Sequence, residues 1–224
     1  MIVPNCPHHI VQRGHNRKAV FLIDSDYEYY LENLVGAKRD FQIKVYAYCL
    51  MTNHVHLIVE PGDDATSISR LMKRLAGRQT RYVNKLEGRT GSLWDGRYKI
   101  SAIERDAYLL ACCRYVELNP IKAGMVARPE DYRWSSYRAK IAGQWEWLDT
   151  DVCFEGLADN PRRRVAEYRR LMSEARSESA DSLIKVALQR SQLTGGYRFI
   201  DEVEARLGAR IELRGGGRPK VVGK

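Results

Sequence analysis

The spacing of apolar residues over the first half of the chain predicts strands and helices in alternation. Short segments with alternating or β-branched apolar residues predict strands at 8–14, 44–50, 54–60 and 97–103. Longer segments with apolar residues three and four positions apart predict helices at 26–40, 66–86 and 106–118. The order β-α-β-β-α-β-α predicts an α+β, ferredoxin-like fold, in which helices pack on one face of an antiparallel sheet of four to five strands.

Polar residues and proline predict where these helices begin and end. Asp26 and Asp106 are expected to cap the first and third helices, because a short acceptor side chain can bind the unpaired N–H groups of a first turn. Pro120 is expected to end the third helix, since proline cannot donate the hydrogen bond that a helix interior requires.

Composition divides the chain into three regions. Residues 1–126 are expected to form the core domain. Residues 127–159 include Trp134 and Trp145 and predict an aromatic-rich segment packed on that core. Residues 160–224 predict a helical, basic C-terminal extension that ends in a flexible tail.

The net charge of +9 is concentrated toward the C-terminal end of the chain. Residues 161–224 contain fifteen Lys and Arg against eight Asp and Glu, so the remainder is nearly neutral. This asymmetry favours an acidic polymer as partner, most simply a nucleic acid. A solvated helical surface is the alternative explanation of the same charges.

The cysteine pattern and the absence of long apolar runs indicate the compartment. The five cysteines are odd in number and include no Cys-x-x-Cys, which predicts reduced thiols and argues against a cysteine-based zinc site. No apolar run reaches the roughly 20 residues of a membrane helix, and the first residues lack a signal-peptide pattern. We therefore expect a cytoplasmic protein with no membrane partner.

A histidine pair, His54 and His56, lies in one of the predicted strands. Residues two apart in a strand point to the same face, so the two imidazoles can reach one metal ion. Two imidazoles leave a divalent ion with open positions for oxygen ligands and substrate. By itself the pattern is more typical of a surface or hydrogen-bonded pair than of a metal site.

Tyr115 and Asn119 are four residues apart on a predicted helix and therefore share a face. The amide oxygen of Asn119 can complete the metal site, and the Tyr115 phenol can attack a phosphate that the ion polarises. A phenol has an ordinary pKa of about 10, so a cation such as Arg114, or the metal, would have to activate it. The ordinary explanations are a core tyrosine and a helix stop at Asn119-Pro120.

Four segments carry a resemblance to a known family. They are His-Val-His-Leu at 54–57, Gly-Ser-Leu-Trp-Asp-Gly-Arg-Tyr-Lys at 91–99, Arg-Tyr-Val-Glu-Leu-Asn-Pro-Ile-Lys-Ala-Gly at 114–124 and Tyr-Arg-Trp-Ser-Ser-Tyr at 132–137. Together they resemble the REP-associated tyrosine transposases, which are single-tyrosine, IS200-like relatives of the HUH transposases. The resemblance implies an endonuclease and strand transferase that depends on Mg²⁺ or Mn²⁺. It also implies single-stranded or hairpin DNA as substrate and a covalent 5′-phosphotyrosine intermediate.

The resemblance assigns roles to residues of this chain. It implies that Tyr115 is the nucleophile, that His54 and His56 bind the metal, and that Asn119 supplies an amide ligand. Hairpin DNA with an unpaired flank also requires cationic contacts to phosphates and stacking on bases. The candidate DNA-binding residues are Arg13, Arg17, Arg70, Lys73, Arg74, Arg97, Lys99, Arg114 and Arg218, with Trp94 and Tyr98 near the elements where bases would stack. His8, His9 and His15 are expected to be structural or solvent-facing.

Two other functions are compatible with the same residues. The chain can be a non-catalytic hairpin-binding or regulatory protein on the same fold, or a replication or plasmid-mobilisation nuclease with another substrate. The sequence also leaves open whether the protein is a homodimer and whether it is an active or a domesticated copy. A bacterial, nucleoid-associated location is expected for the transposase function.

Overall fold

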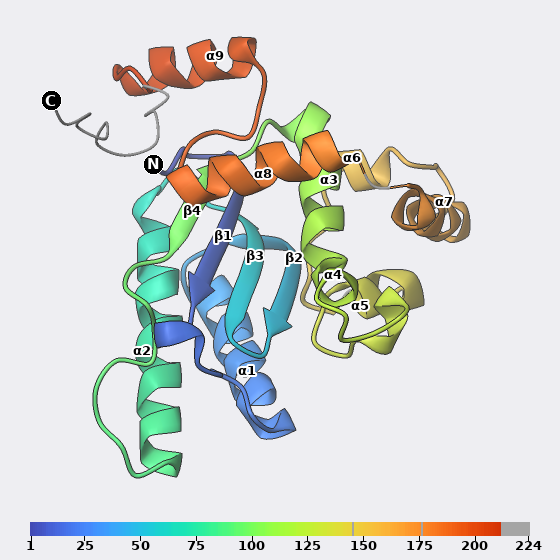
Figure 1. The fold of residues 1–224 in the computed structure, drawn as a ribbon. Coiled ribbons are helices and arrows are strands. Elements are labelled where there is room, and N and C mark those ends of the chain that lie inside the picture. The colour runs from blue at the N-terminus through green and yellow to red at the C-terminus, as the bar shows by residue number, and fades with distance from the viewer. Residues whose placement is uncertain (145, 176, 212–224) are drawn as a thin grey trace, which may run out of the picture.

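Four strands form one antiparallel sheet in this computed structural model, which describes residues 1–211 except 145 and 176. The strands are β1 (His8–Arg13), β2 (Lys44–Met51), β3 (His54–Glu60) and β4 (Lys99–Ala102). Their order in the sheet is β2-β3-β1-β4, so β1 and β3 lie in the middle (Figure 1). The order of elements and the antiparallel sheet confirm the predicted ferredoxin-like fold.

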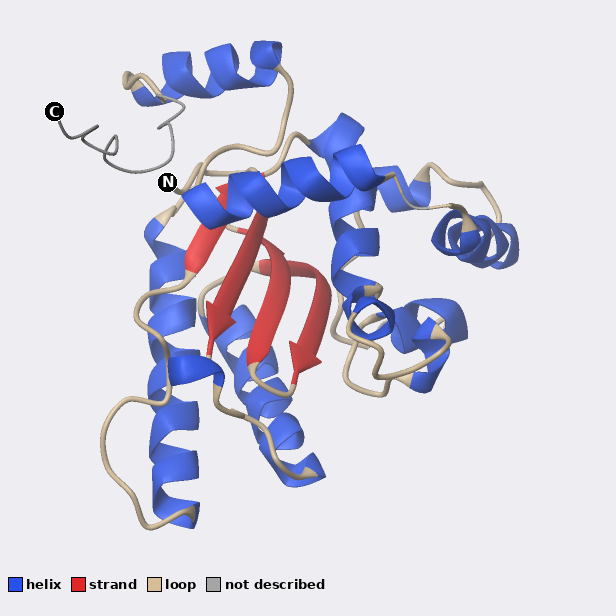
Figure 2. Cartoon of the chain, in the orientation of Figure 1, coloured by secondary structure: helices blue, strands red, loops and turns tan. Residues whose placement is uncertain are grey.

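The helices of the described residues cover both faces of the sheet (Figure 2). Their bounds are α1 (Asp24–Asp40), α2 (Thr66–Leu86), α3 (Arg105–Glu117), α4 (Asn119–Lys122), α5 (Tyr137–Ala142), α6 (Val152–Glu155), α7 (Pro161–Ser173), α8 (Glu178–Arg190) and α9 (Tyr197–Leu207), with 3-10 turns η1 (His15–Arg17) and η2 (Pro129–Asp131). The crossover helices α1 and α2 lie on one face, and α3 and α8 lie on the other. The expectation of helices on one face was therefore wrong, because the chain after β4 returns across the second face.

Strand alternation divides the side chains of β1 between these two layers. Ile10 is fully buried and pairs with Leu57, on the face that α1 and α2 cover with Leu34 and Leu71. Residues 9, 11 and 13 point to the opposite face, toward α3 and α8. The apolar face forms the core, and the other face carries the polar residues of the candidate site.

Helix ends differ from the predicted caps. The first residue of α1 follows Ile23, and Asp26 lies in the first turn, where its carboxylate accepts the N–H groups of Leu22 and Ile23 at 2.6 and 3.1 Å. Asp106 likewise lies in the first turn of α3 and is not its N-cap. An acidic side chain in a first turn stabilises the positive end of the helix dipole from either position.

The break after α3 precedes Pro120. Leu118 has φ −91° and ψ 1°, and α4 begins at Asn119 with Pro120 in its first turn. Proline is accepted there because first-turn N–H groups have no helical partner. The fourth strand is also shorter than predicted, and the chain before it bends at Gly96, which has a φ of +70°.

Residues after α4 pack on the β2 edge of the sheet. Trp134 stacks on Tyr27 with ring centroids 4.5 Å apart, and the Tyr132 hydroxyl donates to the Leu50 carbonyl at 2.6 Å. Trp145 lies outside the described residues. The boundaries of the three predicted regions remain predictions.

The five cysteines are free thiols, and four of them are buried. Burial raises the pKa of the Cys6 thiol to about 11. None of the described helices has the length and apolar content needed to cross a bilayer.

Candidate nuclease site

The structure brings the four predicted site residues to one pocket on the α3 and α8 face of the sheet. His54 and His56 come from β3, Tyr115 from α3 and Asn119 from the start of α4. All four line a cavity of about 500 Å³. The sequence predicted this set, although about sixty residues separate the histidines from the tyrosine.

The hydrogen bonds of His54 define which of its nitrogens can bind an ion. Its Nδ1 lies 2.7 Å from the amide oxygen of Asn53, and the amide nitrogen of Asn53 donates to the Arg17 carbonyl at 3.0 Å. Because the Arg17 contact orients the amide, the imidazole must donate its Nδ1–H, which leaves the Nε2 lone pair for a ligand. Burial and the nearby charge of Arg13 lower the pKa of His54 to about 4.

His56 makes the corresponding contact with His9. The Nδ1 of His56 lies 2.8 Å from the Nε2 of His9, and both side chains are buried. Burial lowers the pKa of His9 to about 3, and burial together with the neighbouring His9 and His54 holds the pKa of His56 well below its ordinary value. The imidazole rings of His54 and His56 are therefore neutral near pH 7, as metal ligation requires.

His9 is a site residue that the sequence reasoning missed. We expected it to be structural or solvent-facing, but its ring lies 5.7 Å from the ring of Tyr115 as well as against His56. His9 and the candidate Arg13 are four residues apart in one predicted strand, so they point to the same face. Their shared face was the signal in the sequence that could have pointed to His9. That His9 meets His56 also depends on the pairing of β1 with β3, which is a feature of the tertiary structure.

Tyr115 is buried, with its ring centroid 6.1 Å from that of His56. The amide nitrogen of Asn119 donates to the Tyr115 carbonyl at 2.7 Å, which leaves its amide oxygen as the group that can bind a cation. The ammonium of Lys122 lies 5.4 Å from the centre of the Tyr115 ring. Arg114, the cation we expected there, instead donates to the carbonyl of Glu174 at the end of α7.

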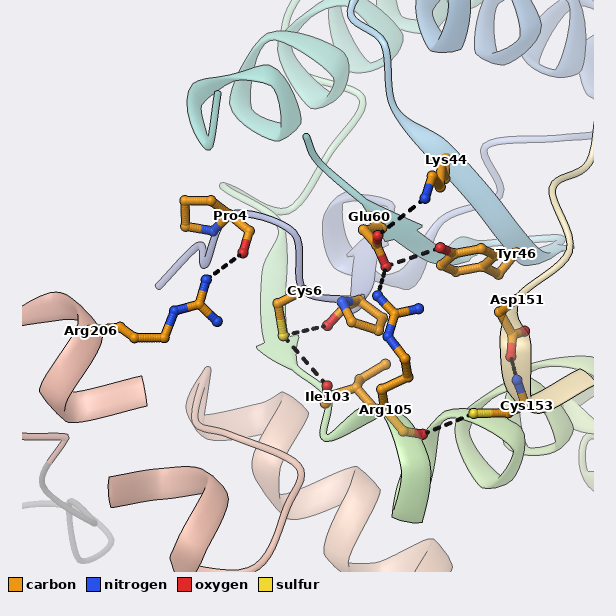
Figure 3. Close-up of polar contacts among 11 residues, drawn as sticks. Pro4, Cys6, Lys44, Tyr46, Glu60, Ile103, Arg105, Asp151, Cys153 and Arg206 are labelled. Atoms are coloured by element: carbon orange, nitrogen blue, oxygen red, sulfur yellow. Dashed lines mark hydrogen bonds and ion pairs between the residues drawn. The ribbon is translucent and has the colours of Figure 1, made fainter. Parts of the chain in front are cut away.

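Two buried carboxylates hold the helix that carries Tyr115. At its first residue, Arg105 binds Glu60, which also accepts the Tyr46 hydroxyl at 3.0 Å and lies 3.5 Å from Lys44 (Figure 3). Glu60 ends β3, so this contact ties α3 to the end of the strand opposite the histidine pair.

At the other end of α3, Glu117 is fully buried. It pairs with Lys140 of α5 at 2.9 Å and accepts the hydroxyls of Ser136 and of Tyr168 in α7, the latter at 2.7 Å. Burial by itself would lower the pKa of Lys140, but the charge of Glu117, its hydrogen bond and the nearby Cys113 and Asp151 together outweigh burial, and the pKa is raised. The last turn of α3 is thereby fixed two residues after Tyr115.

Seven of the nine predicted DNA-binding residues fall into two groups. Four of them line the pocket with the catalytic candidates: Arg13, Arg17, Arg97 and Lys99. The α2 residues Arg70, Lys73 and Arg74 belong to the helix on the opposite face of the sheet, where Arg70 binds Asp64 and Arg74 binds Asp40. Arg218 lies outside the described residues.

Of the two aromatic residues considered for base stacking, Trp94 is a core residue. Its side chain is buried, and its indole N–H donates to the Ala76 carbonyl at 3.2 Å. Tyr98 is half-buried, and its hydroxyl lies 3.1 Å from that of Ser69.

The donor atoms in the pocket fit a divalent cation. Two neutral imidazole Nε2 atoms and one amide oxygen are donors that can bind one divalent cation and leave positions for phosphate and water. No group of three or more His, Cys, Asp or Glu among the described residues forms an alternative metal site.

Comparison with known proteins identifies the family. A solved structure of a REP-associated tyrosine transposase bound to a REP hairpin shares this fold, with a TM-score of 0.57 and 19% identity over 68% of this chain and 90% of that one. A crystal structure of a Deinococcus radiodurans protein is 16% identical over 55% of this chain and 92% of that one, but its TM-score of 0.38 is too low to indicate a shared fold. No curated protein matches the sequence. The family model "Transposase IS200 like" matches residues 2–119, and the chain belongs to this IS200-like transposase family.

Proposed function

We propose that this protein is a metal-dependent DNA endonuclease and strand transferase that acts on single-stranded or hairpin DNA through a phosphotyrosine at Tyr115. The observation that carries the proposal is the meeting of Tyr115 with His54, His56 and Asn119 in one cationic pocket. Membership of a transposase family supports it. The REP hairpin bound by the structural neighbour supports the choice of DNA substrate.

In the proposed reaction the Tyr115 hydroxyl attacks a backbone phosphorus. A new bond joins the phenolic oxygen to phosphorus, the bond from phosphorus to the 3′ oxygen breaks, and that oxygen leaves with a proton as a 3′ hydroxyl. The phenolic proton passes to solvent, and the ammonium of Lys122, which lies 5.4 Å from the centre of the Tyr115 ring, is a nearby cation that favours negative charge on the phenol. The ester retains the free energy of the phosphodiester, so another 3′ hydroxyl can displace Tyr115 without ATP.

His54, His56 and Asn119 would hold the divalent ion, which supplies Lewis-acid stabilisation of the phosphoryl oxygens when bound. The protein residues prepare this arrangement before substrate arrives. Asn53 and His9 orient the two rings, and burial keeps them neutral. The cations around the pocket attract the strand and neutralise its phosphates.

Trapping the covalent adduct tests the proposal. Wild-type protein incubated with labelled hairpins bearing an unpaired 5′ flank and Mn²⁺ or Mg²⁺ is expected to give a protein–DNA band that survives denaturing electrophoresis. Tyr115→Phe and chelation of the metal are each expected to abolish that band. Tyr108→Phe is the matched control, since it removes another hydroxyl from the same helix and should leave the adduct intact.

Two outcomes would contradict this function. Hairpin binding by wild type without an adduct under either metal would indicate the non-catalytic DNA-binding alternative. An adduct that persists in Tyr115→Phe would show that another residue is the nucleophile.

A further inference from the structure

The helix α8 lies across the same face of the sheet as the candidate site. It packs on β1 and β4 (Figure 1). Its buried residues are Ile184, Ala187 and Leu188. Lys185 and Gln189, one turn apart, line the pocket together with Leu188. The family model ends at residue 119, so this wall of the pocket comes from outside the matched region.

The segment after α8 fixes the helix to the sheet. Thr194 forms a parallel bridge with Ile103, and its N–H donates to the Ala102 carbonyl at 2.8 Å. The hydroxyls of Thr194 and Ser101 are 2.7 Å apart and buried. The N–H of Gly196 donates to the Glu104 carboxylate at 2.7 Å. The C-terminal end of α8 is therefore held by several polar contacts to β4 and the residues that follow it.

A weaker contact holds the other end of α8. Asp181 lies 3.8 Å from Lys122, the residue whose ammonium faces the Tyr115 ring. With both ends in contact with the core, α8 is a fixed wall of the pocket in this structure. Side chains on a fixed wall can bind a substrate without first being ordered, which reduces the entropy cost of binding.

The charges around the pocket indicate what this wall binds. Arg13 and Lys99 are strand residues of the sheet, Arg17 ends η1, Arg97 lies in the loop before β4, and Lys185 adds a cation from α8. Asp95 is the single acidic residue among those that line this pocket. A chain placed between these walls thus meets cations on both sides, as a phosphate backbone requires.

The size of the pocket favours unpaired DNA. A pocket of about 500 Å³ is of the size that holds one drug-sized ligand, which corresponds to one or two nucleotides of a single strand. We propose, on the basis of the function inferred above, that α8 is part of the substrate site. In this arrangement Lys185 contacts a phosphate of the unpaired flank, and the Gln189 amide forms a hydrogen bond to the same strand.

The matched pair Lys185→Ala and Arg190→Ala tests this inference. Each variant removes one exposed cation from α8, but Arg190 does not line the pocket. Both are made in full-length Tyr115→Phe protein, and affinity for a labelled hairpin with an unpaired flank is measured across a salt series. Lys185→Ala is expected to weaken binding several-fold and to make the negative slope of log affinity against log salt shallower by about 0.7, the value for one phosphate contact on a single strand. Arg190→Ala is expected to leave that slope unchanged.

A probe of the same hairpin without its flank distinguishes contacts to the unpaired strand from contacts to the stem. Lys185→Ala and its parent are expected to bind this probe equally. The inference is overturned if Lys185→Ala and Arg190→Ala bind the flanked hairpin alike, or if Lys185→Ala binds it more tightly than the parent does. It is also overturned if Lys185→Ala loses as much affinity for the hairpin without a flank as for the hairpin with one. If the parent binds neither probe, the proposed function fails as well, so the two failures are distinguishable. Thermal unfolding of each variant checks that α8 remains folded.

Discussion

At the scale of single residues, neighbours select the chemical form of the metal-ligand candidates. Each imidazole of the pair has its Nδ1 engaged, His54 by Asn53 and His56 by His9, and so presents Nε2 to the pocket. For His56 to bind an ion through Nε2, its Nδ1 must carry the proton and His9 must accept it. Partners of this kind fix ring orientation and tautomer in metal sites. His9 would therefore influence a bound ion through His56.

His9→Phe is expected to lower Mn²⁺ affinity by about 10- to 100-fold, because it keeps a ring but removes the nitrogen that accepts the His56 proton. Isothermal titration with Mn²⁺ in the absence of DNA measures this directly. His15→Ala is the control, since His15 is exposed and does not line the pocket. Equal Mn²⁺ affinity in His9→Phe and wild type would show that His9 has no positioning role.

At the scale of elements, α3 is fixed at both ends by buried carboxylates. Glu60 holds Arg105 at its start, and Glu117 holds Lys140 and Tyr168 at its end. The second network joins α3 to α5 and α7, so the position of Tyr115 depends on helices that come later in the chain. A buried ion pair is costly to break from one side, because the remaining charge stays out of contact with water.

Lys140→Met is expected to destabilise the protein by about 3–5 kcal/mol, since it leaves the buried Glu117 without its cation. Urea unfolding measures the loss. The double variant Glu117→Gln with Lys140→Met should recover part of it, because no buried charge remains. Arg170→Ala breaks only exposed pairs on α7 and should change stability little. A Lys140→Met loss no larger than that of Arg170→Ala would refute the prediction.

At the scale of the whole molecule, the sheet buries several neutral histidines and should lose stability in acid. Burial lowers the pKa of His8 to about 3, against an ordinary value of 6.5. The unfolded chain therefore takes up this proton first as the pH falls. The stability that the neutral, buried His8 side chain contributes is complete above pH 6.5 and is lost progressively between about pH 6.5 and pH 3.

His8→Gln is expected to flatten the dependence of unfolding free energy on pH by up to about 1.4 kcal/mol per pH unit in that window. Glutamine keeps an acceptor for the Val3 N–H, which His8 binds at 3.0 Å, but it does not titrate. Urea unfolding between pH 7 and pH 4.5 in the presence of EDTA gives the slope. His15→Gln, an exposed histidine, is the control. Parallel pH profiles for His8→Gln and wild type would contradict this account.

Local patterns were sufficient for the order of elements and for showing which of the candidate residues share a face. The spacing of apolar residues located β1 to β4 and α1 to α3. Side chains return to the same face every two residues in a strand and every 3.6 residues in a helix, so this spacing can be read from the sequence alone. The spacing of the histidine pair and of Tyr115 with Asn119 placed each pair on one face of its element. These properties depend only on the geometry of a single strand or helix.

Tertiary structure decided what depends on contacts between distant elements. The pairing of β1 with β3 placed His9 against His56, and the path of the chain after β4 put α3 and α8 on the second face of the sheet. Because of the same path, Arg114 donates to the Glu174 carbonyl, and the Lys122 ammonium lies near the Tyr115 ring. The sequence by itself therefore determined which side chains share a face of an element. Which faces meet was decided by packing, because burial of apolar surface and pairing of buried charges are satisfied only in the assembled fold.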